Sequence, residues 1–289
     1  MNGRVVVGVD GSPRGLDAVA YSAHAARSRR AALRVVHAFV RPAHLPPGAV
    51  SPRPVLEQAL ETANDLVDEG VRLARTTAAE VSVSGLVVHG EALAVLEAQS
   101  RAADLVVVGS RGRGGFEGVL LGSTATGLAA HGRCPVVVVR EQTEPYGPVL
   151  VGVDGSPAGA AAVRFALAEA TRLGAPVVAL HAWTTWNAPM PPPQDPSLPY
   201  ANPPGALAAA EERVLTEALS GLGERYPDVK VEHRVVHGPT RQALIEASRT
   251  ARLTVVGSRG RGGFTGLLLG SVSQAVLHHA HSPVAVVRG

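Results

Sequence analysis

Two glycine-rich segments have the residue types and the spacing of a phosphate-binding loop. In the first, Gly109-Ser110-Arg111-Gly112 is followed by nine residues and then by Gly122-Ser123. Glycine has no Cβ, so main-chain N–H groups can approach phosphate oxygens closely, and a helix N-terminus adds partial positive charge. The same spacing returns at Gly257, Gly260 and Gly270. The sequence therefore predicts two anion sites, and a tight turn without a ligand is the alternative for each copy.

Polar residues beside these glycines could also hold an anion. Ser123 and Ser271 follow the last glycine of each segment, so each is expected to cap a helix and to donate a hydroxyl group. Positive charge at the rim would come from Arg111, Arg113, Arg259 and Arg261.

Other phosphate-binding motifs fit less well. A P-loop needs a lysine, and neither segment contains one. A dinucleotide-binding fingerprint has the spacing G-x-G-x-x-G. If Gly112 and Gly114 were its first two glycines, the third position would be Glu117, so the fingerprint is absent. Arg-Gly-Arg-Gly-Gly also occurs in RNA-binding segments, but here it appears once per half inside a folded pattern. We expect no nucleic-acid partner.

The elements that must position these residues come from an internal repeat. Val7–Pro13 returns letter for letter as Val151–Pro157, and Val107–Phe116 returns as Val255–Phe264. A repeat of this length indicates duplicated domains. The predicted domains are residues 1–144 and residues 145–289. The second half gains a few residues between the two blocks, and we place this insertion in a proline-rich surface loop, Pro189–Pro204, whose counterpart is Arg41–Pro54.

Short valine-rich runs alternate with amphipathic stretches in each half. In the first half the predicted strands are Val5–Val9, Leu33–Phe39, Val81–Val88, Leu105–Val108 and Val136–Val139. The predicted helices are Pro13–Arg30, Pro54–Thr77, Glu91–Ala102 and Ser123–Gly132. Strands that are apolar on consecutive positions are typical of parallel sheets buried on both faces. We predict an α/β fold with one parallel sheet per half, flanked by helices on both faces.

Composition narrows the class of protein. The 289 residues are 46% hydrophobic and 18% charged, which is enough to bury a core, and the formal net charge is only +3. The single cysteine, Cys134, excludes an intrachain disulfide and a cysteine zinc cage. No apolar run is long enough to span a bilayer, and we expect no signal peptide before Val5. We expect a cytoplasmic protein without a membrane partner.

An aspartate after the first strand, a histidine near the end of the second and the doubled glycine spacing resemble the universal stress protein family in its tandem, ATP-binding form. The resemblance covers both halves. It implies five parallel strands per domain in the order 3-2-1-4-5, with two helices on each face. It also implies ATP as the ligand, one per domain. Because a carboxylate beside a triphosphate would be repelled, we expect ribose or magnesium as the partner of the aspartates. In strand order 3-2-1-4-5 a crevice opens between strands one and four, where open α/β sheets bind ligands.

The resemblance also assigns roles to individual residues. The aspartates Asp10 and Asp154 would bind ribose or adenine, and the backbone at Ala38 and Ala182 would bind the adenine edge. The ribose would lie against Gly109 and Gly257. The phosphates would be held by Gly112, Gly122 and Ser123, and by Gly260, Gly270 and Ser271. Thr124, Val272, Arg111 and Arg259 complete the predicted nucleotide-binding residues.

Several of these residues have simpler interpretations. Asp10 and Asp154 could cap the first helix, because Asp-Gly-Ser is turn chemistry. His37 and His181 fit satisfied core histidines better than ligand contacts. His278, His279 and His281 do not share one helix face, so we predict no metal site there.

Two functional hypotheses follow. The first is a regulatory ATP-binding stress protein in which the nucleotide controls the proline-rich loops and thereby the choice of an unknown protein partner. The second is a nucleotide-consuming enzyme, either a slow ATPase or an adenylyl transferase, although the signature sequences of such transferases are absent. Pairing through the fifth strands and a homodimer of the whole chain are further expectations.

Overall fold

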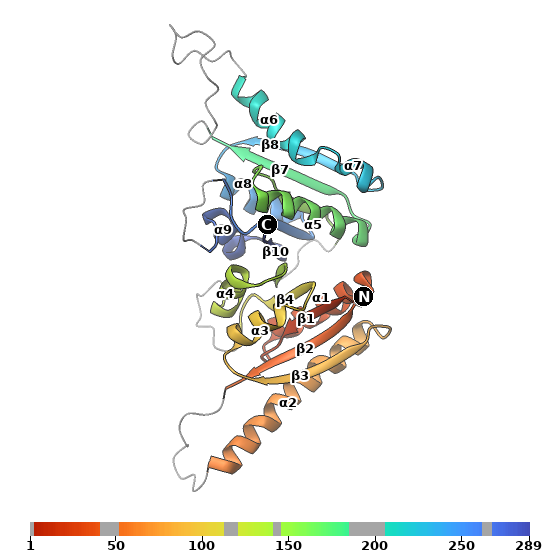
Figure 1. The fold of residues 1–289 in the computed structure, drawn as a ribbon, viewed down its shortest axis with the longest axis vertical. Coiled ribbons are helices and arrows are strands. Elements are labelled where there is room, and N and C mark those ends of the chain that lie inside the picture. Colours follow the sequence, from red (N-terminus) through yellow and green to blue (C-terminus); the bar gives the residue numbers. More distant parts are fainter. Residues whose placement is uncertain (1–2, 41–51, 113–120, 141–145, 185–205, 262–267) are drawn as a thin grey trace. The chain divides into compact units, whose positions relative to one another are not determined.

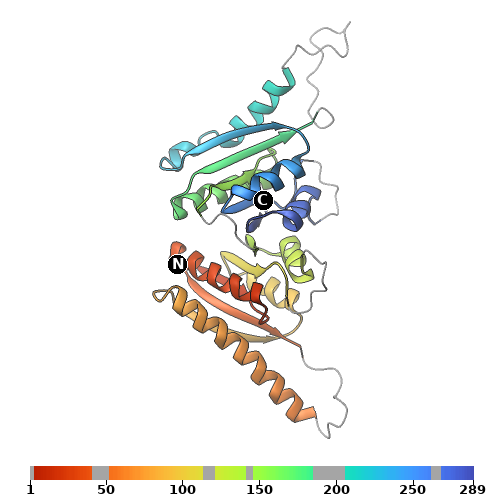
Figure 2. The same ribbon diagram turned by 180° about the vertical axis from the view of Figure 1, so that it is seen from behind.

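A computed structural model describes residues 3–40, 52–112, 121–140, 146–184, 206–261 and 268–289. The chain divides into two compact units, Met1–Glu141 and Gln142–Gly289, and each is considered by itself (Figures 1 and 2). Arg113, most of the two proline-rich loops and most of the predicted domain boundary lie outside the described residues.

The first domain is a five-stranded parallel sheet with helices on both faces, which confirms the predicted fold class. Its strands are β1 (Arg4–Gly8), β2 (Ala32–Phe39), β3 (Val83–His89), β4 (Leu105–Gly109) and β5 (Val136–Val139). Its helices are α1 (Pro13–Arg29), α2 (Pro52–Thr77), α3 (Ala92–Ser100) and α4 (Ser123–His131). The strand order is β3-β2-β1-β4-β5, as the resemblance implied.

Burial explains why β1, β4 and β5 consist mostly of valine. β5 is buried along its whole length, and the three central valines of β1 are fully buried. Helices α1 and α2 pack together on one face of the sheet, while α3 and α4 pack together on the other (Figure 1). Both faces are therefore covered, as β-branched apolar runs without alternation predict.

The second domain repeats this arrangement. Its strands are β6 (Val149–Gly152), β7 (Val177–Trp183), β8 (Val231–His237), β9 (Leu253–Gly257) and β10 (Val284–Val287), ordered β8-β7-β6-β9-β10. Its helices are α5 (Pro157–Leu173), α6 (Ala206–Leu219), α7 (Leu222–Arg225), α8 (Thr240–Ala247) and α9 (Ser271–His279), with a short 3-10 turn at Ser248–Thr250.

The long helix before the third strand differs between the domains. α2 is continuous over 26 residues, whereas its counterpart is divided into α6 and α7. The break falls at Gly221, whose φ of 72° is left-handed and suits glycine. None of the described helices is long and apolar enough to cross a membrane.

Replacing Leu105 in β4 by alanine tests how far this sheet determines stability. Leu105 is 0% exposed, so Leu105→Ala should lower the free energy of unfolding of the first domain by about 2–5 kcal/mol. Urea unfolding followed by circular dichroism measures the change. Leu60→Ala is the matched control, because Leu60 is 38% exposed and should change stability by less than about 1 kcal/mol.

Candidate functional site

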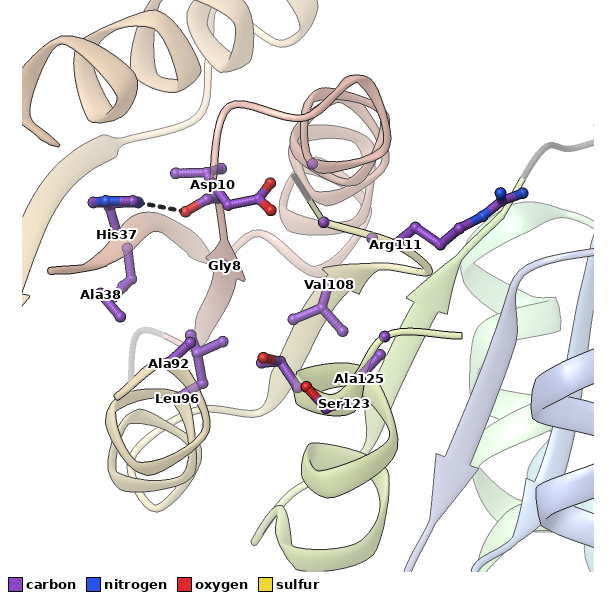
Figure 3. A pocket seen from close by; sticks show the side chains of 17 residues that line it. Gly8, Asp10, His37, Ala38, Ala92, Leu96, Val108, Arg111, Ser123 and Ala125 are labelled. Carbon is purple, nitrogen blue, oxygen red and sulfur yellow. Dashed lines mark hydrogen bonds between the residues drawn. The ribbon is translucent and has the colours of Figure 1, made fainter. Parts of the chain in front are cut away.

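In each domain a cavity lies at the carboxyl ends of the central strands. In the first domain the cavity has a volume of about 460 Å³ and lies where β1 and β4 run side by side (Figure 3). The chain leaves β1 into α1 on one face of the sheet, whereas α3 and α4 cover the other face. Such a point, where neighbouring strands are connected in opposite directions, is where open α/β sheets form ligand crevices.

The structure brings together, in two cavities, all the residues to which the family resemblance assigns a role in nucleotide binding. Lining the first cavity are Asp10, Ala38, Gly109, Arg111, Gly112, Gly122, Ser123 and Thr124. Lining the second, of about 740 Å³, are Asp154, Ala182, Gly257, Arg259, Gly260, Gly270, Ser271 and Val272. Both volumes lie within the ~300–1,000 Å³ that is typical of small-molecule sites. The roles of these residues toward a ligand stay predictions.

Asp10 is part of a helix cap as well as of the cavity wall. Its Oδ1 accepts hydrogen bonds from the Ser12 main-chain N–H (3.0 Å) and from the Ser12 hydroxyl (2.6 Å). The Ser12 Oγ in turn accepts from the Gly15 N–H at 3.0 Å, which caps α1. Asp154 and Ser156 repeat this pattern. The aspartates therefore stabilise the turn before each helix, but they do not cap it, because the N-cap residues are Ser12 and Ser156.

Two glycines in each loop are required by the protein itself. A Cβ on Gly112 would collide with Oδ2 of Asp10, and a Cβ on Gly109 would lie 2.6 Å from the Arg14 carbonyl oxygen. Gly260 and Gly257 meet the equivalent atoms of Asp154 and Ala158. The glycine loop thus touches both the aspartate and the first turn of the preceding helix.

The glycine at the start of α4 has no such structural reason. A Cβ on Gly122 would have its nearest described neighbour at 3.7 Å, and its φ of −71° is open to any residue. The equivalent distance at Gly270 is 3.5 Å. Among the described residues, nothing in the fold demands glycine at these two positions, which is what a closely approaching ligand would explain.

The expectation that Ser123 and Ser271 cap their helices is wrong. The N-cap residues are Gly122 and Gly270, and neither helix start has a side-chain cap hydrogen bond among the described residues. The chain turns one residue earlier than expected, so Ser123 is the first helical residue and its side chain is exposed. Unlike α1, helix α4 presents its first turn to the cavity without a serine cap.

The two strand-two histidines connect neighbouring strands. His37 Nδ1 lies 2.8 Å from the Val9 carbonyl oxygen, and His181 Nδ1 lies 2.7 Å from that of Val153. A carbonyl only accepts, so each Nδ1 carries the proton. Both rings have a structural partner, as expected, but both also line their cavities.

Positive charge gathers near the first cavity. Arg111 is exposed, and Figure 3 shows its side chain extending away from the other labelled residues. Burial, together with repulsion from Arg111, lowers the pKa of Arg140, which follows β5. An anion bound nearby would relieve this repulsion. The described residues contain no cluster of three His, Cys, Asp or Glu side chains that could hold a metal ion.

Sequence reasoning missed the apolar wall of the first cavity and the polar wall of the second. Ala92, Leu96 and Val108 line the first. Glu211, Thr240 and Trp183 line the second. Ala92 and Thr240 follow the third strand of their domain closely, so the rule that ligands bind at carboxyl strand ends could have located them. Glu211 gave no such signal, because its contact depends on packing between distant segments.

The fold and the two cavities define a tandem α/β protein with a crevice in each domain. The model of the Universal stress protein family matches residues 1–140 and residues 145–288. Two proteins of Mycobacterium tuberculosis, Universal stress protein Rv1996 and Universal stress protein Rv2623, are each 38% identical to the chain. These matches cover 98% of this chain and 94% and 96% of theirs. This chain therefore belongs to the universal stress protein family.

A solved structure shows the same fold. The crystal structure of a universal stress protein from Archaeoglobus fulgidus DSM 4304 is similar with a TM-score of 0.71 at 18% sequence identity. The similarity covers 99% of this chain and 96% of that one.

The glycines of the loop should differ in how they tolerate a methyl group. Gly109→Ala places a Cβ against the Arg14 backbone and should lower the free energy of unfolding by about 1–3 kcal/mol. Gly122→Ala places its Cβ at ordinary van der Waals distance, 3.7 Å from the nearest described atom, and should change the free energy of unfolding by less than about 1 kcal/mol. If urea unfolding showed the same loss of unfolding free energy in both variants, packing would not distinguish Gly109 from Gly122, and our explanation of the two glycines would be wrong.

The single thiol should be unreactive. Burial raises the pKa of Cys134 to about 12, so almost none of it is thiolate at pH 8. Alkylation by iodoacetamide should be at least about a hundredfold slower than for a free cysteine peptide. Mass spectrometry measures the rate, and unfolding in guanidinium should restore it. Rapid labelling of the folded protein would show that the thiol is exposed.

Proposed function

We propose that each domain binds one ATP molecule, with magnesium, and that the protein acts as a regulatory nucleotide-binding module in the stress response. A protein partner would recognise whether nucleotide is bound, and hydrolysis of the nucleotide would not be required. Magnesium would arrive bound to the triphosphate.

One observation carries the proposal. Helices α4 and α9 each start at a glycine with space beside it, and their first turns line a cavity without a side-chain cap among the described residues. The main-chain N–H groups of a first turn have no partner within the helix, and the helix dipole favours negative charge there. Phosphate oxygens match both properties.

The other walls suit the rest of a nucleotide. In the first domain, Leu96 and Val108 offer apolar surface for a base, and the backbone of Ala38 lies at the same cavity. Asp10 is held in position by Ser12, so it can accept from a ribose hydroxyl group without reordering. These contacts favour a nucleotide over a free phosphate ion, because the cavity is larger and more apolar than phosphate needs.

Blocking the helix starts should remove one site at a time. In titration calorimetry with Mg-ATP, the wild-type chain should bind two nucleotides. Gly122→Val should bind one, and Gly122→Val with Gly270→Val should bind none, because a branched side chain would occupy the phosphate position. Gly223→Val is the control and should keep both sites, since Gly223 lies in α7 and a Cβ there would meet no described neighbour within 4 Å. Two bound nucleotides in the double variant would refute the proposal.

Turnover distinguishes a binding protein from an enzyme. The purified chain, saturated with Mg-ATP, should release phosphate or pyrophosphate far more slowly than the ~1 s⁻¹ and above that is usual for enzymes. The double variant gives the background rate. Steady release at that enzymatic rate, lost in the double variant, would favour the nucleotide-consuming enzyme instead.

A further inference from the structure

The two cavities differ at the end opposite the glycine loop. In the second domain, His181 Nε2 lies 2.5 Å from Glu211 Oε2, and the two side chains are only 6% and 3% exposed. Both residues line the second cavity. Glu211 comes from α6, which packs on β7 and β8 as α2 packs on β2 and β3. Counted back by the spacing that relates Gly260 to Gly112, its counterpart is Ala63, which is equally buried and has no polar group.

The hydrogen bonds of His181 determine how this pair is arranged. Nδ1 must carry a proton, because it faces the Val153 carbonyl oxygen. Nε2 faces a carboxylate oxygen, and two lone pairs at 2.5 Å would repel each other. A second proton therefore lies between Nε2 and Oε2, whichever of the two atoms holds it more tightly. The pair as a whole then adds no net charge to the cavity wall.

This arrangement leaves one acceptor without a donor. Oε1 of Glu211 is buried and has no hydrogen-bond partner among the described residues. Oε1 remains a hydrogen-bond acceptor whether the shared proton is bound to Nε2 or to Oε2. Leaving a buried acceptor unsatisfied destabilises a protein, and a ligand that brings an N–H donor would remove that cost.

A second contact at the same end points the same way. Thr240 Oγ1 donates to the Ala182 carbonyl oxygen at 3.1 Å, so part of the accepting capacity of Ala182 is already used. The first domain has Ala92 at the matching place, which cannot make this bond. The second cavity therefore has less main-chain acceptor capacity at this end and gains a side-chain acceptor, Glu211.

We propose that Glu211 is a specificity-determining residue of the second cavity and that it selects a purine nucleotide whose base carries an exocyclic amino group. This inference rests on the proposed function, since it assigns the base end of the same site. Oε1 has almost no surface open to the empty cavity, so the Glu211 carboxylate must move toward the cavity for the amino group to donate to Oε1, while His181 keeps Oε2 bonded. The first cavity, with Ala63, lacks this selection.

The proposal is tested in the full-length chain by comparing how tightly three purine triphosphates bind at each site. Gly122→Val blocks the first site, and Gly270→Val blocks the second, so each site can be titrated alone. The probes are ATP, with a 6-amino group, GTP, with a 2-amino group, and purine riboside triphosphate, with neither. At each site we compare the affinity for ATP or GTP with the affinity for purine riboside triphosphate. This ratio should be at least about tenfold larger at the second site than at the first. The comparison of ATP with GTP shows which amino position is selected.

Substitutions of Glu211 separate recognition from stability. Glu211→Ala, which copies the first domain, should reduce the preference to that of the first site. Glu211→Gln should keep most of it, because its amide N–H can donate to Nε2 of His181 while its oxygen takes the place of Oε1. Ala63→Glu in the chain with a blocked second site should create the preference at the first site, next to His37.

The outcomes are distinct. A preference that is unchanged in Glu211→Ala, or equal at both sites in the parent chain, would overturn the proposal even though nucleotide binds. Failure of all three triphosphates to bind at the second site would overturn the proposed function together with it. Loss of thermal stability in Glu211→Ala with an intact preference would make the His181–Glu211 pair purely structural.

Discussion

The main-chain amides at the starts of α4 and α9 are the feature on which the rest of the site depends. Each helix begins at a glycine and lacks a side-chain cap in the described residues, although α1 and α5 in the same domains are capped by their own serines. An uncapped first turn on a surface is satisfied by water, but here it lines a cavity at the carboxyl edge of a parallel sheet. The parallel topology therefore brings a donor-rich helix end to the one edge where the other strands also end.

The aspartates show how the protein holds that edge together. Asp10 orders Ser12, Ser12 caps α1, and the Ser12 hydroxyl also lies 3.3 Å from the Arg111 carbonyl oxygen in the glycine loop. One carboxylate thus joins the end of β1, the start of α1 and the loop after β4. The structural and the ligand-binding interpretations of Asp10 are compatible, because a side chain that is fixed by its own domain is a preorganised partner for a ligand.

Local patterns in the sequence predicted most of the fold but only part of the site. Runs of valine located the strands, and β5 begins and ends at the expected residues, because burial on both faces selects for apolar residues without alternation. The helix cap at Ser123 was misplaced by one residue, since the point where a chain turns into a helix depends on the loop before it. Glu211 could not be found at all. Its partner His181 lies 30 residues earlier in the chain, and only packing of α6 on β7 brings the two together.

The two ends of the cavity are built from different kinds of atoms. This difference explains why the two domains resemble each other closely at the glycine end and less closely at the opposite end. The glycine end uses main-chain atoms and depends on backbone spacing, and there both domains keep Gly-Ser-Arg-Gly and the later Gly-Ser, although Val272 replaces Thr124. The opposite end is made of side chains, where Glu211 stands for Ala63, Thr240 for Ala92 and Trp183 for Phe39. A side-chain wall can change one residue at a time without disturbing the sheet. A tandem protein can therefore keep two similar glycine ends while its two cavities, of about 460 and 740 Å³, diverge in shape and in hydrogen bonding.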